Sequence, residues 1–176
     1  MAERTLILVL TATPGEALHL LKSTLATQGL QLATYDEGKV YRLNSTGDQV
    51  SSSESEIRHI LQTEGTASFQ WWLDVNHDLY CHIHKSPQMT QIELGMEGAD
   101  SREIDALRAS FMQLWNDDTE AGMVRAFLFD PEGISEDVDW ERFLCQSEPP
   151  ENWPALGFPM ELRALLGHLA LERIED

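Results

Sequence analysis

Three β-rich runs separated by short turns occupy the middle of this chain and constrain its fold more than any other feature. They cover residues 69–75, 78–84 and 89–96, and Asn76-His77 between the first two suits a tight hairpin turn. The third run has apolar residues at alternate positions, namely Ile92, Leu94 and Met96. Consecutive strands joined by short turns pair antiparallel. The pattern therefore predicts a three-stranded antiparallel meander.

A turn at Asn76-His77 also predicts which residues face one another in the hairpin. The facing pairs are Val75 with Asp78, Leu73 with Tyr80, Trp71 with His82, and Phe69 with His84. One face of the hairpin is then rich in aromatic and imidazole rings, and the other is the core face, with Trp72, Leu79, Cys81 and Ile83. The aromatic face is either a second core layer beneath a helix or a binding surface with Trp71 and Tyr80 as contact residues.

Before the meander, the pattern changes from strand to helix and back to strand. Residues 5–11 form a continuous apolar run that is typical of a strand buried on both faces. Thr13 then suits an N-cap, with Pro14 at the first helical position and Glu16 completing a capping box. Two further strands are expected around an Asp36-Glu37-Gly38 turn, at residues 30–35 and 39–43. Residues 44–55 are polar and predict a flexible surface loop, and residues 56–62 are ambiguous between helix and strand.

After the meander, two helices and a strand are expected. Asp100 or Ser101 can cap a helix with an apolar side made of Ile104, Leu107, Phe111, Leu114 and Trp115. A strand is expected over 123–129, and Pro159 is expected to open a last helix that carries Leu162, Leu165, Leu166 and Leu169. The expected strands outnumber the expected helices, and the helices occur between them in the sequence. The prediction is therefore an α+β fold: a single domain over 1–176 with a largely antiparallel sheet and helices packed against it.

The chain is strongly acidic, with 30 Asp and Glu against 12 Lys and Arg and a formal net charge of -18. Such a field repels nucleic-acid phosphates and anionic membranes and speeds encounter with cationic surfaces. It therefore argues against nucleic-acid and membrane partners and favours a basic protein, although acidity also serves solubility alone. No segment approaches the length of a membrane span, and the short apolar run near the N-terminus does not resemble a signal peptide. We expect a cytoplasmic protein.

The acidity is concentrated in residues 130–151, named the acidic segment below. Eight acids there face the single base Arg142, and apolar residues recur among them, so the segment is not typical of a disordered tail. Ser135 can cap a short helix, and helix-start chemistry alone is an alternative explanation for some of the carboxylates. The candidate partner-binding residues of this segment are Asp130, Glu132, Glu136, Asp137, Asp139, Trp140 and Glu141.

His82 and His84 are the nearest approach to a chemical motif. Histidines at i and i+2 of a strand point to the same side, as two ligands of one metal must, but this spacing is not specific. His77 is expected at the hairpin tip, too far away to join both, and Cys81 points to the opposite face. We therefore expect no metal and no cofactor, with His82 and His84 as the only metal candidates. Cys81 and Cys145 are expected as separate reduced thiols.

Two classes of function are compatible with these features. The first is a non-enzymatic binding protein that neutralises or sequesters a basic partner, such as an immunity protein or inhibitor acting on a cationic toxin or nuclease. The second is a small metal-assisted hydrolase centred on His82 and His84. An adaptor or scaffold subunit would share the chemistry of the first. Phosphate-binding loops and hydrolase signatures are absent from the sequence, so the first class is preferred.

Overall fold

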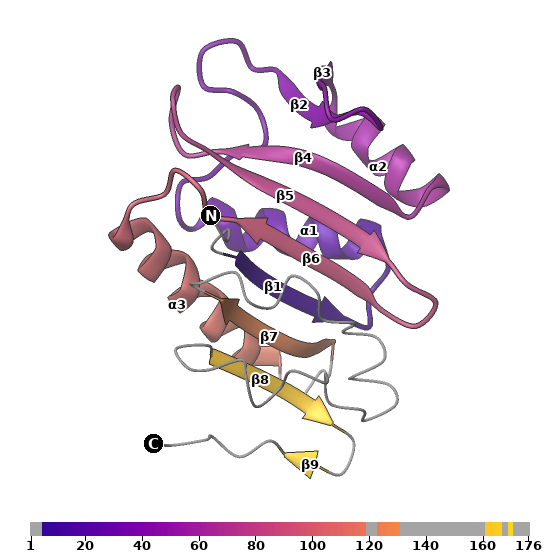
Figure 1. Ribbon diagram of the computed structural model, residues 1–176, viewed down its shortest axis with the longest axis vertical. Helices are drawn as coiled ribbons and strands as arrows, with labels where there is room; N and C mark the ends of the chain where they lie inside the picture. The colour runs from indigo at the N-terminus through magenta and orange to yellow at the C-terminus, as the bar shows by residue number, and fades with distance from the viewer. Residues whose placement is uncertain (1–4, 119–122, 131–160, 167–168, 171–176) are drawn as a thin grey trace.

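The computed structural model describes residues 5–118, 123–130, 161–166 and 169–170. Its described strands form a sheet of order β3-β2-β4-β5-β6-β1-β7-β8-β9, and every named pairing is antiparallel. The described helices α1, α2 and α3 lie behind this sheet in the view of Figure 1. The predicted α+β class and the largely antiparallel sheet are therefore confirmed.

The N-terminal strand and helix follow the sequence prediction closely. Strand β1 (Thr5–Leu10) lies between β6 and β7, and its residues from Leu6 onward are buried, which explains its continuous apolar run. Helix α1 (Pro14–Ala26) begins with the predicted capping box: the Thr13 side chain accepts from the Glu16 backbone N–H, and the Thr13 N–H donates to the Glu16 carboxylate at 2.8 Å.

The meander is confirmed, but the register predicted for its first hairpin is wrong. Strands β4 (Thr66–Trp72), β5 (Asp78–Lys85) and β6 (Thr90–Gly95) pair consecutively. Asp74 forms the turn, because its Oδ1 accepts from the backbone N–H groups of Asn76 and His77 at 2.7 and 2.9 Å. This Asx-type turn moves the hairpin tip toward Asp74 and shifts the pairing by an odd number of residues.

The shift exchanges the faces of the two neighbouring tryptophans. The observed pairs include Trp71 with Leu79, Phe69 with Cys81, and Ser68 with His82. Trp71 is 1% exposed and belongs to the core, whereas Trp72 lies on the same face as Tyr80. The predicted aromatic face with Trp71, Phe69 and Tyr80 together therefore does not exist.

Residues 30–63 also differ from the prediction. Residues 30–35 make only isolated bridges, through Gln31 and Ala33, in place of a strand. Strand β2 (Val40–Leu43) pairs with β3 (Gln49–Ser52), which lies inside the range predicted as a loop. Helix α2 (Glu54–Thr63) is capped by Ser53, whose side chain accepts from the Glu56 N–H at 3.2 Å. The polar composition of 44–55 reflects a hairpin turn, an edge strand and a helix cap rather than a loop.

Helix α3 (Ser101–Asp118) begins at the predicted place, with Asp100 as the cap. The Asp100 Oδ1 accepts from the Arg102 and Glu103 N–H groups at 2.8 and 3.0 Å, and the Asp100 N–H donates to the Glu103 carboxylate. Strand β7 (Val124–Asp130) follows as predicted. The helix predicted after Pro159 is wrong over its described part, because residues 161–166 form strand β8 (Glu161–Leu166), and β9 (Leu169–Ala170) pairs with it.

One large core lies between the helices and the sheet. Side chains of α1, α2 and α3 meet alternate residues of the strands there. The fully buried side chains of largest volume include Trp71, Phe69, Phe111 and Phe127. Because side chains alternate along a strand, the remaining residues of β4, β5 and β6 point to the other face of the sheet. That other face is where the histidines lie.

Candidate functional site

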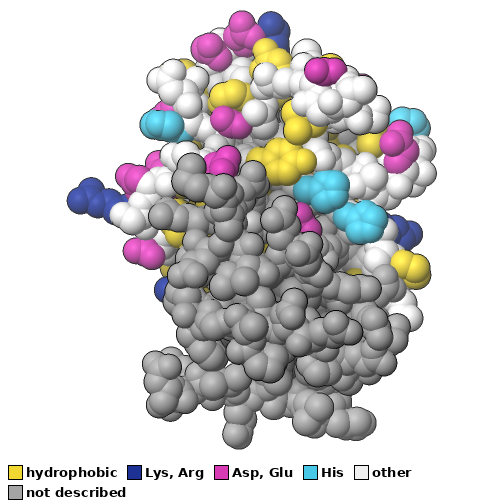
Figure 2. Space-filling view, viewed as in Figure 1, with side chains coloured by type: hydrophobic (Ala, Val, Ile, Leu, Met, Phe, Trp, Pro, Cys, Tyr) yellow, Lys and Arg dark blue, Asp and Glu magenta, His cyan; other side chains and the backbone are white. Residues whose placement is uncertain are grey.

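The face of the sheet opposite the helices is polar over β4, β5 and β6 and is named the polar face. Its residues come from every second position of the three strands, as the pairing requires. They are Thr66, Ser68, Gln70, Trp72, Asp78, Tyr80, His82, His84, Gln91 and Glu93. Figure 2 shows this side, with neighbouring histidine side chains beside a hydrophobic one and an acidic one. Tyr80 is 38% exposed and His84 is also exposed, so this face meets solvent.

His82 occupies the centre of the polar face. Its Nδ1 lies 2.7 Å from the Ser68 Oγ, and its Nε2 lies 3.5 Å from the Thr66 Oγ1. Glu93 is directly opposite His82 on β6. The rings of His82 and His84 stack with their centroids 6.2 Å apart and an interplanar angle of 10°. The predicted direction of these histidines, toward one side of the strand, is therefore confirmed.

This environment holds His82 in its neutral form at neutral pH. Burial lowers the pKa of the imidazole, the Glu93 carboxylate raises it, and His84 lowers it again, so that the net direction is downward. The Ser68 hydroxyl can both donate and accept, so it can form a hydrogen bond with the neutral ring whether or not the His82 Nδ1 carries the proton. The burial that lowers the pKa arises from the position of His82 on a strand paired on both sides.

Amide side chains link one carboxylate of the polar face to the neighbouring strands. The Gln49 amide on β3 donates to the Gln70 carbonyl oxygen, and the Gln70 amide donates to the Asp78 carboxylate at 2.6 Å. Trp72 packs edge-on against Tyr41 of β2, with the ring centroids 6.2 Å apart. These contacts order the side chains of this part of the polar face.

The register connects the polar face to the start of the acidic segment. Tyr80 pairs with Gly95, Gly95 with Thr5, and Thr5 with Asp130, so these residues form one row across β5, β6, β1 and β7. At a strand spacing of about 4.8 Å, the row is about 14 Å long from Tyr80 to Asp130. The chain therefore enters the acidic segment from the row of the sheet that carries Tyr80.

Two carboxylates that accept backbone hydrogen bonds, Asp74 and Asp100, lie at the end of the sheet that carries the row from Tyr80 to Asp130. Backbone N–H groups lower the pKa of Asp74, chiefly through Asn76, and that of Asp100, through Glu103 and Arg102. Asp74 belongs to the β4–β5 turn and Asp100 caps α3 just after β6. Both carboxylates are consequently ionised at neutral pH and add to the negative field there.

The predicted site residues lie in different environments. Tyr80 is exposed on the polar face, whereas Trp71 is a core residue and offers no side chain to a partner. Asp130 ends β7. The other predicted residues of the acidic segment lie outside the described residues: Glu132, Glu136, Asp137, Asp139, Trp140 and Glu141.

Sequence reasoning missed Ser68 and Gln70 as members of the histidine face. The signal that could have found them was Asp74, an Asx-turn former two residues before Asn76. A turn centred there places Ser68 opposite His82 and puts the even-numbered residues of β4 on the polar face.

Two catalytic roles were considered for His82: ligand of a catalytic metal, and general base for a Ser68 nucleophile. Within the described ranges, no group of three or more His, Cys, Asp or Glu is arranged to hold a metal ion. Ser68 and His82 resemble a nucleophile and base, but β4 and β5 are each paired on both sides at this point. That pairing commits nearby backbone N–H groups to the sheet, where they do not serve an oxyanion.

We predict that the purified protein carries no stoichiometric transition metal. Replacing His82 and His84 together by glutamine should leave unfolding cooperative, with about 1 kcal/mol or less lost at His82 for its Ser68 hydrogen bond and less at exposed His84. Elemental analysis and denaturant unfolding of both proteins check this. One equivalent of zinc that disappears in the double variant would instead support the metal-assisted hydrolase.

Comparison with known protein families, curated proteins and solved structures finds no match to this chain. None of the described helices is both long enough and apolar enough to cross a membrane.

Proposed function

We propose that this protein is a non-enzymatic binding protein of the cytoplasm that neutralises or sequesters a basic partner protein. The partner class that fits best is a cationic toxin or enzyme such as a nuclease, for which this chain would be the immunity protein or inhibitor. Its carboxylates would occupy the positions that substrate phosphates take in the partner's site. The same negative field disfavours nucleic acids and anionic membranes as partners.

The observation that carries the proposal is the distribution of charge around the polar face. Among the described residues of β2 to β6, this face holds Asp78 and Glu93 and no lysine or arginine. The row through Tyr80 leads to Asp130, where the acidic segment with its eight-to-one excess of acids begins. A cationic partner placed over this row would meet an aromatic anchor and carboxylates together.

The chemistry of the polar face also suits protein recognition. Interfaces are enriched in tyrosine and tryptophan, whose large rings lose little entropy on binding. Tyr80 is exposed, and Trp72 lies on the same face in contact with Tyr41. Tyr80 is the expected anchor, and Trp140 would supply a second ring from the acidic segment.

Capture followed by reconstitution tests this function. Immobilised protein is incubated with lysate of the source cells at about 20 mM and about 150 mM salt, where the Debye length falls from roughly 20 to 8 Å. The expected result is a basic protein that is retained at both concentrations and forms a stoichiometric complex when both proteins are purified. Retention of only neutral or acidic proteins would contradict the proposal.

The partner's own activity then separates an inhibitor from an adaptor. An equimolar amount of this protein should abolish that activity if the acidic surface covers the partner's functional site. A basic partner that stays fully active in the complex would show instead that this chain acts as an adaptor or scaffold subunit.

A further inference from the structure

We infer that His82 and His84 make binding of the basic partner depend on pH, so that the complex forms at neutral pH and weakens in mild acid. The inference rests on the proposed function and adds a regulatory property to the same surface. Its basis is the position of both imidazoles on the polar face, stacked at 6.2 Å in a region of β2 to β6 where the described residues supply no other cationic group on this face.

The groups that face the histidines determine the direction of the effect. His82 faces Glu93 on β6 and the hydroxyls of Ser68 and Thr66 on β4. His84 is placed opposite Thr66 on one side and Gln91 on the other. Glu93 is therefore the one carboxylate that the described pairing places directly beside the two rings.

Protonation would oppose a cationic partner in two ways. It adds positive charge at the centre of the surface that the partner covers, and like charges across an interface are unfavourable. A charged His82 would also pair with Glu93 directly opposite, which removes that carboxylate from the partner's reach. By linkage, a partner that disfavours the protonated rings must bind less tightly when they are protonated.

The pH window follows from ordinary ionisation. Carboxylates titrate near pH 4 and lysines near pH 10, so histidine is the side chain that changes charge between about pH 7.5 and about pH 5. The pKa of His82 is already lowered by burial, and the ring therefore enters the window neutral. Protonation of imidazole over this interval offsets the charges of Asp78 and Glu93, so the polar face becomes less negative.

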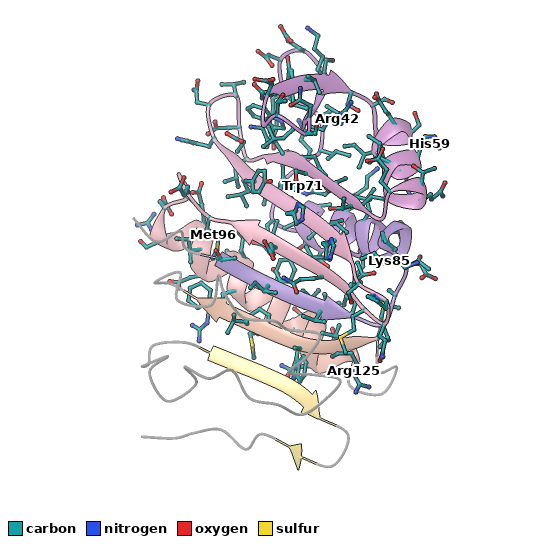
Figure 3. All side chains as sticks on the ribbon, turned by 45° about the vertical axis from the view of Figure 1, so that its right-hand side comes forward. Arg42, His59, Trp71, Lys85, Met96 and Arg125 are labelled. Atoms are coloured by element: carbon teal, nitrogen blue, oxygen red, sulfur yellow. The ribbon has the colours of Figure 1, made fainter. Side chains whose placement is uncertain are left out.

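The probe for the test is a lysine homopolymer of about 20 residues, because its own charge is constant between pH 7.5 and 5. Binding is measured by calorimetry or fluorescence anisotropy at low ionic strength for the unmodified chain and for the His82→Gln/His84→Gln variant. The matched control is His19→Gln/His59→Gln, which removes two exposed histidines from α1 and α2 in the helix layer. Figure 3 shows His59 on the outer side of α2.

We expect the affinity of the unmodified chain and of the control to fall about tenfold from pH 7.5 to pH 5, and that of the His82/His84 variant to fall less than about twofold. Either of two results overturns the inference. One is an affinity of the unmodified chain that does not change between pH 7.5 and pH 5, and the other is an affinity of the His82/His84 variant that falls over this range as much as that of the unmodified chain. Neither result affects the proposed function, whose failure is a different observation: the absence of a stoichiometric basic partner in the capture experiment.

Discussion

Replacing Trp71 by alanine should lower the free energy of unfolding by about 3–5 kcal/mol. Trp71 is 1% exposed and packs in the core beside Phe69, with the ring centroids 6.1 Å apart. It lies on β4, where Figure 3 labels it, and belongs to the core between the sheet and the helices. Removing the indole leaves a cavity that the rigid sheet cannot close, so both transfer free energy and packing are lost.

Trp72 is the matched control, because it is the same residue type one position along the same strand. It is half-buried on the polar face and makes an edge-on contact with Tyr41. Its replacement by alanine should cost only about 1–2 kcal/mol. Denaturant unfolding monitored by circular dichroism measures both costs. A larger loss for Trp72 than for Trp71 would show that the hairpin has the register with Asn76-His77 at its tip.

Reversing charge in the acidic segment should slow association with the basic partner about tenfold. The variant is Glu136→Lys/Glu141→Lys, and its control is Asp36→Lys/Glu64→Lys, which changes the net charge equally at exposed positions beside β2 and at the end of α2. Because nearby charges steer encounter more strongly than distant ones, the control should slow association only about twofold. Stopped-flow or surface-based kinetics with the purified partner gives both rates.

Tyr80→Ala should affect the same complex differently. The side chain is an uncharged anchor in the row that leads to Asp130, so its loss should leave the association rate within about twofold and raise the dissociation rate about tenfold or more. Equal association rates for the two charge variants would show that the acidic segment is not part of the interface. An unchanged dissociation rate for Tyr80→Ala would show that the polar face is not part of the interface.

The parts of the fold that the sequence predicts are those set by local chemistry. Thr13 and Asp100 cap their helices as expected, since each cap depends on a side chain and N–H groups within three residues. The apolar run of β1 and the meander were likewise readable, because burial on one or both faces fixes their patterns. These elements establish the α+β class without any information on long-range contacts.

The parts that could not be predicted depend on competition between local signals or on distant partners. Asp74 and Asn76-His77 are both turn formers, and only the pairing of the whole hairpin selects the turn at Asp74. Strand β8 contains leucines at spacings that also suit a helix, and its strand state depends on pairing with β7 far earlier in the chain. The polar composition of β3 reflects its position at the edge of the sheet.

The candidate site was predictable only in part for the same reason. His82, His84 and Tyr80 alternate on one strand, so their common face follows from local geometry. Their neighbours Ser68 and Gln70 come from β4 and depend on a register that the wrong turn shifts by an odd number of residues. The link from Tyr80 to Asp130 requires the order of β5, β6, β1 and β7, which no local pattern contains.

The association rate of the unmodified protein with its purified partner, measured as a function of ionic strength, tests the central claim most directly. If the acidic surface guides a basic protein onto this chain, the rate should fall by about a hundredfold between roughly 20 mM and 500 mM salt, as the Debye length shrinks to a few ångströms. A rate that stays within about twofold over that range would contradict the proposed function, because electrostatic attraction would then play no part in partner recognition.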